Sequence, residues 1–186
     1  MIVEEFRFLS VDDEHDSHRY QNWSRPYEYK IVNDYLDTKL SPGATVHNSA
    51  WGSAAIHLTF RNKLDEVYKC THSDINGRED TYRYNILNKD ETLVSSYDAV
   101  LNVSVLEHLG GFHQTRKALL NLYEHLKPGG YLICTFDYPR VDLQSLEQFL
   151  NVDCKRVENP LTGNNSICPD PTINLNIVFL VIKRPQ

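Results

Sequence analysis

Polar side chains that could take part in chemistry come at the end of an apolar run, residues 97–103, which read Tyr-Asp-Ala-Val-Leu-Asn-Val. A short run of this kind is typical of a strand buried on both faces. Parallel sheets bind their ligands outside the carboxyl ends of such strands. We therefore expect Asn102, Val103 and Ser104 to line a binding cleft.

Glu107 and His108 follow this strand closely. A histidine can act as a general base because its pKa lies near neutrality. The alternative, which we favour for this pair, is that both residues open the next helix and support its N-terminus. They are thus weak candidates for catalysis.

A second polar group follows a strand-like run at residues 67–73, where Asp74 and Ile75 come next. A carboxylate at such a strand end can accept hydrogen bonds from both hydroxyls of a ribose, as it does in dinucleotide-binding folds. The competing interpretation is that Asp74 is an ordinary turn residue. The sequence thus offers a candidate ribose site beside the first one.

The third candidate is a turn of small residues at 48–54, Asn-Ser-Ala-Trp-Gly-Ser-Ala. It joins an expected strand at 44–49 to an expected helix that ends near residue 64. A glycine allows backbone N–H groups to approach a ligand at the start of a helix. An ordinary strand-to-helix turn explains the same pattern.

The elements that must position these residues alternate between strand and helix, which predicts a Rossmann-like, doubly wound α/β fold with a mostly parallel sheet. A break at residues 127–130, Lys-Pro-Gly-Gly, separates a helix from a strand. The expected strands are 44–49, 67–73, 82–87, 97–103, 131–136, 154–157 and 174–182. The expected helices are 27–40, one that follows the turn at 50–54 and ends near residue 64, 116–126 and 143–150. The last strand is almost wholly apolar, so we expect it to be deeply buried, and the terminal pair of strands predicts one antiparallel partner.

The N-terminal residues read differently. Residues 1–24 are polar and include an acidic run at 12–16, which indicates a solvated arm. Ser24 is an expected N-cap for the helix at 27–40. We expect 1–40 to form an arm and a lid helix, and 41–186 to form the rest of a single domain.

Composition narrows the function. The 186 residues are 41% hydrophobic and 24% charged, typical of one globular domain, and the net charge of −6 disfavours a nucleic acid as ligand. No apolar stretch is long enough to span a membrane and no signal peptide is visible, so a cytoplasmic protein is expected. Cys70 and Cys134 read as core residues, and for Cys154 and Cys168 free thiols are favoured over a disulfide or a metal site.

Residues 97–109, YDAVLNVSVLEHL, and residues 125–136, HLKPGGYLICTF, closely resemble the fourth and fifth strands of class I S-adenosylmethionine-dependent methyltransferases. The order and spacing of these motifs are specific, and the resemblance extends more weakly from residue 41 to the C-terminus. It implies a seven-stranded sheet with an antiparallel last strand.

The resemblance also identifies the turn at 48–54 with the glycine loop of this family. Asn48 stands at the acidic position, while Ala50, Gly52 and Ala54 stand at the three glycine positions. Only one glycine remains, although its replacements are small. This degenerate loop leaves two interpretations open, a divergent cofactor site or a non-catalytic binding protein of the same fold.

S-adenosylmethionine is the implied cofactor. In the family, the ends of the second and third strands hold the ribose and adenine, and an N-terminal helix closes over the cofactor. The expected cofactor-binding residues are Arg25, Asn48, Ala50, Trp51, Gly52, Ser53, Asp74, Ile75, Asn85, Ile86, Asn102, Val103 and Ser104. We expect a methyltransferase that acts on an O or N nucleophile of a small or sugar-like molecule, with no metal.

Overall fold

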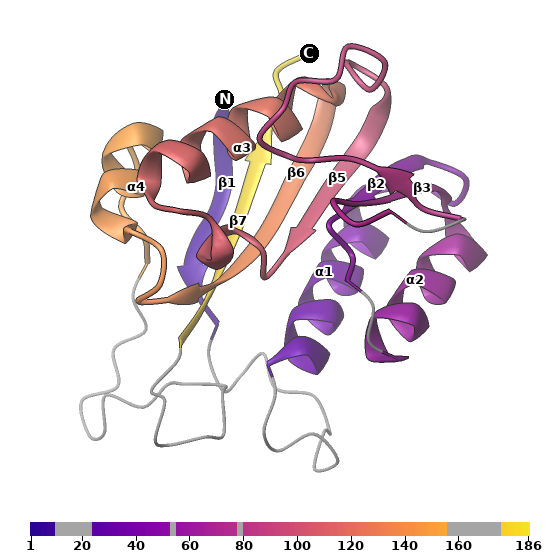
Figure 1. Cartoon of the computed structure of the whole chain (residues 1–186), viewed down its shortest axis with the longest axis horizontal. Coiled ribbons are helices and arrows are strands. Elements are labelled where there is room, and N and C mark those ends of the chain that lie inside the picture. Colours follow the sequence, from indigo (N-terminus) through magenta and orange to yellow (C-terminus); the bar gives the residue numbers. More distant parts are fainter. Residues whose placement is uncertain (10–23, 53–54, 78–79, 156–175) are drawn as a thin grey trace.

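A computed structural model describes residues 1–9, 24–52, 55–77, 80–155 and 176–186 of the chain. Its centre is a seven-stranded sheet in the order β1-β7-β6-β5-β2-β3-β4 (Figure 1). The strands are β1 (Ile2–Phe8), β2 (Thr45–Ser49), β3 (Lys69–Asp74), β4 (Tyr82–Arg83), β5 (Tyr97–Val103), β6 (Leu126–Tyr138) and β7 (Asn176–Lys183).

Strands β2 to β6 pair in parallel, and β7 runs antiparallel to both of its neighbours. The predicted Rossmann-like fold with a seven-stranded sheet and an antiparallel last strand is therefore confirmed. Residues 177–182 are all buried, as their apolar sequence predicts.

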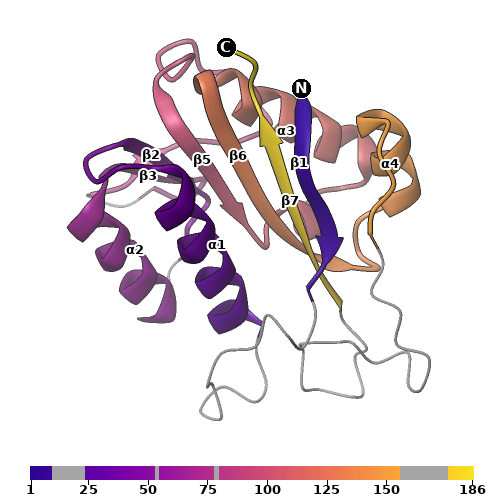
Figure 2. The same ribbon diagram turned by 180° about the vertical axis from the view of Figure 1, so that it is seen from behind.

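Helices cover both faces of the sheet. Helices α1 (Arg25–Lys39) and α2 (Ala55–Val67) lie on one face, and α3 (Phe112–Glu124) and α4 (Leu143–Leu150) on the other (Figures 1 and 2). The side chains of β6 alternate between the two hydrophobic clusters, since Ile133 packs with α1 and α2 while Leu132 and Cys134 pack with α3 and α4. This alternation decides which polar groups of β6 can meet α1.

The expected irregular arm is wrong for residues 2–8, which form the edge strand β1. Ile2–Phe8 pairs antiparallel with β7, and Phe6 and Phe8 are buried while charged residues between them remain partly exposed. Lys155, in the expected strand 154–157, makes a single parallel bridge with Arg7. Strand β1 thus occupies the edge position of the sheet that the segment 154–157 was expected to fill. Residues 156–157 lie outside the described residues.

Two further boundaries differ from the prediction. Strand β4 ends at Arg83 and not at 87, because Asn85 begins a turn in which its side chain accepts a hydrogen bond from the Leu87 N–H at 3.0 Å. The expected break at 127–130 lies inside β6, where the register shifts relative to β5. Gly129 there adopts φ +82°, which only glycine adopts without strain, so the glycines allow the strand to continue.

Candidate active site

The carboxyl ends of β2, β3 and β5 meet at one edge of the sheet. Ser49 pairs with Ser73 on one side and with Asn102 on the other, so the three strands end at the same level. Asp74 and Ser104 follow directly on the neighbouring strands. The structure thus brings together the three polar groups that the sequence places at strand ends.

The turn after β2 has the backbone of a glycine loop. Ala50 and Gly52 both have positive φ, +53° and +79°. The N–H of Trp51 donates to the carbonyl of Ser73 at 3.3 Å, which holds the turn against β3. Ala50 therefore occupies a conformation that favours glycine, as its alignment with a glycine position predicts.

Gly52 is enclosed. A Cβ at this position would lie 2.8 Å from Cδ2 of His57 on α2, so the turn has no room for a side chain. The hydroxyl of Tyr29 on α1 is hydrogen-bonded to Nδ1 of the same histidine. The two helices are thereby joined next to the turn, and Ser53 lies outside the described residues.

Trp51 forms part of the wall behind the turn. Its side chain is buried, its Nε1–H donates to Oγ1 of Thr81 at 3.2 Å, and the Arg61 guanidinium lies 5.0 Å from its ring centroid. A bulky indole at a position between small residues is therefore accommodated inside the protein.

Asp74 lies beside this turn. Its Oδ1 accepts from the N–H of Asn76 at 2.9 Å, and its Oδ2 lies 3.4 Å from the N–H of Gly52. Ile75 next to it is 55% exposed. The Asp74 carboxylate and the exposed Ile75 side chain thus lie next to the turn.

Three other residues expected to contact the cofactor are buried or already hydrogen-bonded within the protein. Ile86 is 6% exposed and packs in the core on the α3 side, so it has little surface to offer a ring. Asn85 uses its side-chain oxygen in the turn described above. Val103 is buried on the opposite face, in the cluster with α1.

Two buried asparagines support the strand ends. The Asn48 amide lies 3.2 Å from Nδ1 of His72, and the Asn102 Nδ2 donates to the Ser49 hydroxyl at 3.1 Å. Asn102 is completely buried, and among the described residues its Oδ1 has no hydrogen-bond partner. Both side chains thus hold neighbouring strands together within the sheet.

Helix α1 is anchored over the ends of β5 and β6. The Glu28 carboxylate is completely buried and accepts hydrogen bonds from the hydroxyls of Ser104 and Thr135. Arg25 contacts Glu28 at 3.0 Å and the Ser104 carbonyl at 3.3 Å. Ser24 stands at the N-cap as predicted, but its hydroxyl donates to Glu28 at 2.8 Å and caps no backbone N–H.

Glu28 and Thr135 were not among the predicted site residues. Glu28 lies on the same stripe of α1 as the fully buried Val32 and Leu36, at intervals of four residues. A carboxylate on an apolar stripe is the signal that could have identified it, because a buried charge needs partners.

Glu107 belongs to a 3₁₀ turn at Leu106–His108 that lies against β6, and it is 8% exposed. Burial, and secondarily the charges of Asp137 and Glu28, raises the pKa of its carboxyl to about 8. Burial also raises the pKa of Asp137. His108 is exposed, so Glu107 is the buried member of the pair.

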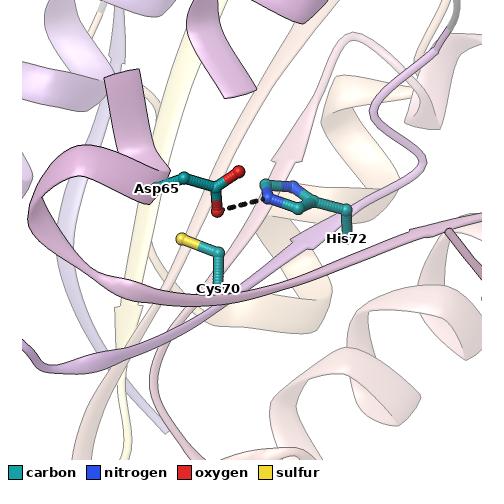
Figure 3. Close-up of side chains that lie close together, drawn as sticks. All are labelled: Asp65, Cys70 and His72. Carbon is teal, nitrogen blue, oxygen red and sulfur yellow. Dashed lines mark hydrogen bonds and ion pairs between the residues drawn. The ribbon is translucent and has the colours of Figure 1, made fainter. Parts of the chain in front are cut away.

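A separate cluster lies behind the turn, where Asp65, Cys70 and His72 point toward one another (Figure 3). Their ligand atoms lie within 4.8 Å of one another, the spacing of a metal site. The Nε2 of His72 is 2.8 Å from Asp65 Oδ1, while its Nδ1 faces the Asn48 amide. Because Nδ2 of Asn48 donates to Nδ1 of His72, the proton of the His72 ring is on Nε2. Arg61 adds a positive charge 3.8 Å from the Asp65 carboxylate. These contacts describe a hydrogen-bonded triad that fixes α2 to β3.

The comparisons with known proteins agree with this geometry. Residues 84–134 match the family model described as a methyltransferase domain. No curated protein matches the sequence. Among solved structures, the 1,6-didemethyltoxoflavin-N1-methyltransferase of Burkholderia thailandensis has 14% identity and a TM-score of 0.58, and the match covers 95% of this chain and 85% of that one.

Two further solved structures are similar over most of their length. The N-methyltransferase NodS of Bradyrhizobium japonicum, in complex with S-adenosyl-L-homocysteine, has 14% identity and a TM-score of 0.55, covering 93% of this chain and 94% of that one. An rRNA methylase of Streptococcus thermophilus has 17% identity and a TM-score of 0.53, covering 86% and 97%. The chain therefore has the fold of the class I S-adenosylmethionine-dependent methyltransferases, and the predicted resemblance is confirmed. In the described residues, no helix is long and apolar enough to cross a membrane.

Proposed function

We propose that this protein is an enzyme that transfers a methyl group from S-adenosylmethionine to an O or N nucleophile of a small molecule. The observation that carries the proposal is the turn after β2, which keeps positive φ at Ala50 and Gly52 although one of these glycine positions is alanine. The change to alanine at position 50 has therefore not altered the left-handed backbone that a glycine loop uses. The N-methyltransferases among the similar folds favour a small acceptor, and the rRNA methylase is the competing case.

The described residues fit this cofactor. His57 fills the side-chain direction of Gly52, so the methionine part would pass along the backbone of the turn next to Asp74. Asp74 would accept the ribose hydroxyls, and the exposed Ile75 would pack on the adenine. Arg25 would meet the cofactor carboxylate at the N-terminal end of α1.

When bound, the cofactor supplies an electrophilic methyl group on a positively charged sulfur, whose electron pair returns to the sulfur as the methyl leaves. The protein mainly aligns the two reactants and excludes water. The buried contacts of Glu28 with Ser104 and Thr135 hold α1 over the strand ends and so close this side of the site. No residue of the chain needs to form a covalent bond.

A non-catalytic binding protein of the same fold is the alternative, favoured by the loss of glycines at positions 50 and 54. Titration of the purified protein with S-adenosylmethionine and S-adenosylhomocysteine by calorimetry separates binding from its absence. Production of S-adenosylhomocysteine in the presence of acceptors then separates an enzyme from a binding protein.

Gly52→Val is the variant that tests the turn. We expect it to abolish cofactor binding and, because of the contact with His57 and φ +79°, to lower stability as well. Gly43→Val is the matched control, since Gly43 also has positive φ, +84°, but has open space around it. If Gly52→Val binds the cofactor like the control, or if the wild type binds neither ligand, the proposal is wrong.

A further inference from the structure

We propose that the methyl acceptor is an amine, held between Glu107 and Asp137 at the carboxyl ends of β5 and β6. This inference rests on the proposed function and adds to it the chemical class of the acceptor. It follows from two carboxyl groups near these strand ends, each with a buried oxygen that has no hydrogen-bond partner among the described residues.

Glu28 marks the place. Its carboxylate contacts Ser104 after β5 and Thr135 in β6, so this point of the sheet lies directly under α1. Asp137 is two residues beyond Thr135, and side chains two apart in a strand point to the same face. Asp137 therefore faces the α1 side of the sheet, close enough to Glu28 for the two charges to interact.

Two carboxyl oxygens at this place are buried and unpartnered. Glu107 is more than nine-tenths buried, yet within the described residues its Oε2 has no hydrogen-bond partner, and neither does the buried Oδ1 of Asp137. A buried acceptor without a partner costs free energy, so proteins rarely keep one without a use. An ammonium group, with three N–H donors, can satisfy both oxygens.

The charges around the two carboxyl groups also favour a cation. Glu28 is occupied by Arg25, Ser24, Ser104 and Thr135, so its ion pair with Arg25 is complete. Arg140 and His108 are the other cationic groups that act on Asp137, and both are exposed. Arg25, the remaining cation that acts on Glu107 and Asp137, is paired with Glu28. Burial keeps Glu107 largely neutral near pH 7, and a bound cation would favour its ionised form.

A metal ion fits this place less well than an organic cation. In the part of the chain that the structure describes, only Asp65, Cys70 and His72 bring three ligand atoms within 4.8 Å of one another. Glu28, Glu107 and Asp137 do not form such a group. The charge of Asp137 acts on Glu107, so the two carboxyl groups lie near each other without a third ligand that a metal ion would need.

Glu107 can also take the proton that an ammonium must lose before it can be methylated. The proton moves from nitrogen to the Glu107 carboxylate, which leaves a lone pair on nitrogen to form the new carbon–nitrogen bond. Burial raises the pKa of Glu107 to about 8, nearer to that of an ammonium group than an ordinary carboxyl is. The proton then passes from Glu107 to water.

The test uses full-length protein saturated with S-adenosylhomocysteine and two matched pairs of probes, D-glucosamine with D-glucose and benzylamine with benzyl alcohol. We expect at least one amine to bind at least about tenfold more tightly than its alcohol, with affinity rising between about pH 6 and 8 as Glu107 ionises. Glu107→Gln and Asp137→Asn should each weaken amine binding about tenfold and leave the affinity for S-adenosylhomocysteine unchanged. Glu66→Gln, which removes an exposed carboxylate from α2, is the matched control.

Three outcomes would overturn the inference. In the first, amines and alcohols bind equally. In the second, no amine binds at about 10 mM to protein that does bind S-adenosylhomocysteine. In the third, Glu107→Gln weakens binding of S-adenosylmethionine but not of S-adenosylhomocysteine and leaves amine binding unchanged, so that the carboxyl group serves the sulfonium charge. If the wild type binds neither S-adenosylmethionine nor S-adenosylhomocysteine, the proposed function is wrong.

Discussion

Glu28 of helix α1 and Thr135 of strand β6 are hydrogen-bonded across 107 residues of sequence. The same carboxylate contacts Ser104, so one completely buried side chain joins α1 to the ends of two strands. Glu28 thus supplies the side-chain acceptor that fixes α1 to both strand ends, in addition to the apolar packing of the helix.

Glu28→Leu tests this anchor. The leucine would fill the site but leave the Ser24, Ser104 and Thr135 hydroxyls without this acceptor and remove the carboxylate that pairs with Arg25. We expect a loss of about 3–5 kcal/mol in the free energy of unfolding, the usual cost of breaking a buried charge pair. Denaturant unfolding measures it, with Glu66→Leu as the exposed control. A loss no larger than the control's would mean that Glu28 does not hold α1.

Ala50→Gly tests the strain in the turn after β2. Ala50 has φ +53°, where a Cβ costs about 1–2 kcal/mol, while glycine adds about 0.5–1 kcal/mol of chain entropy. We therefore expect the variant to be more stable than the wild type by up to about 1 kcal/mol, and to keep cofactor binding. Thermal unfolding beside Ala118→Gly, a buried helical position where glycine should destabilise, gives the comparison. A lower stability of Ala50→Gly would contradict the left-handed backbone.

Two buried histidines predict how stability depends on pH. Burial lowers the pKa of His47 to about 3 and that of His125 to about 4, and their Nδ1 atoms lie 3.3 Å apart. Between these values and the ordinary pKa of about 6.5, the unfolded chain binds more protons than the folded one. Each histidine should therefore remove about 1.4 kcal/mol of stability per pH unit as the pH falls below about 6.

Denaturant unfolding at about pH 7 and pH 5 measures this dependence, and His125→Gln should lose less stability than the wild type over this range, by about 1.4 kcal/mol per pH unit below about 6. The exposed His113→Gln should leave the difference between the two pH values as it is in the wild type. An equal loss in wild type and His125→Gln would show that His125 is protonated in the folded protein.

How far the sequence could be interpreted depended on whether the signal was local. Strand β5 and helix α4 begin and end at the predicted residues, because an apolar run and an amphipathic stripe define them without help from elsewhere. Strand β1 was missed because its charged residues read as a solvated arm, and only pairing with β7 makes it a strand. The contact of Glu28 with Thr135 could not be predicted, since nothing in a local pattern joins residues so far apart.

The Asp65, Cys70 and His72 triad gives a prediction about metal removal. His72 donates to Asp65 and its other nitrogen faces Asn48, while the Cys70 thiol donates to the Tyr68 carbonyl, so each of the three side chains has a partner within the protein. Treatment with a chelator should leave the melting temperature unchanged, whereas His72→Ala should lower stability by about 1–3 kcal/mol. Cys70→Ser is the matched change that keeps the site polar. A fall in melting temperature on chelation, reversed by Zn²⁺, would show that the triad holds an ion.

Glu107→Gln should stabilise the protein, and more so at higher pH. The pKa of Glu107 is raised to about 8 in the folded state from an ordinary value of about 4.3, so in this window the folded protein binds more protons than the unfolded chain. The stability that the neutral carboxyl contributes is complete below about pH 4 and is lost as the pH rises towards 8, at about 1.4 kcal/mol per unit. Glutamine stays neutral and removes this loss, so the variant should gain on the wild type from about pH 5 to 8, which denaturant unfolding at several pH values measures. Glu66→Gln should show no such trend. A constant difference between Glu107→Gln and the wild type would mean that Glu107 is already ionised in the folded protein, and that it is no more basic than an ordinary carboxylate.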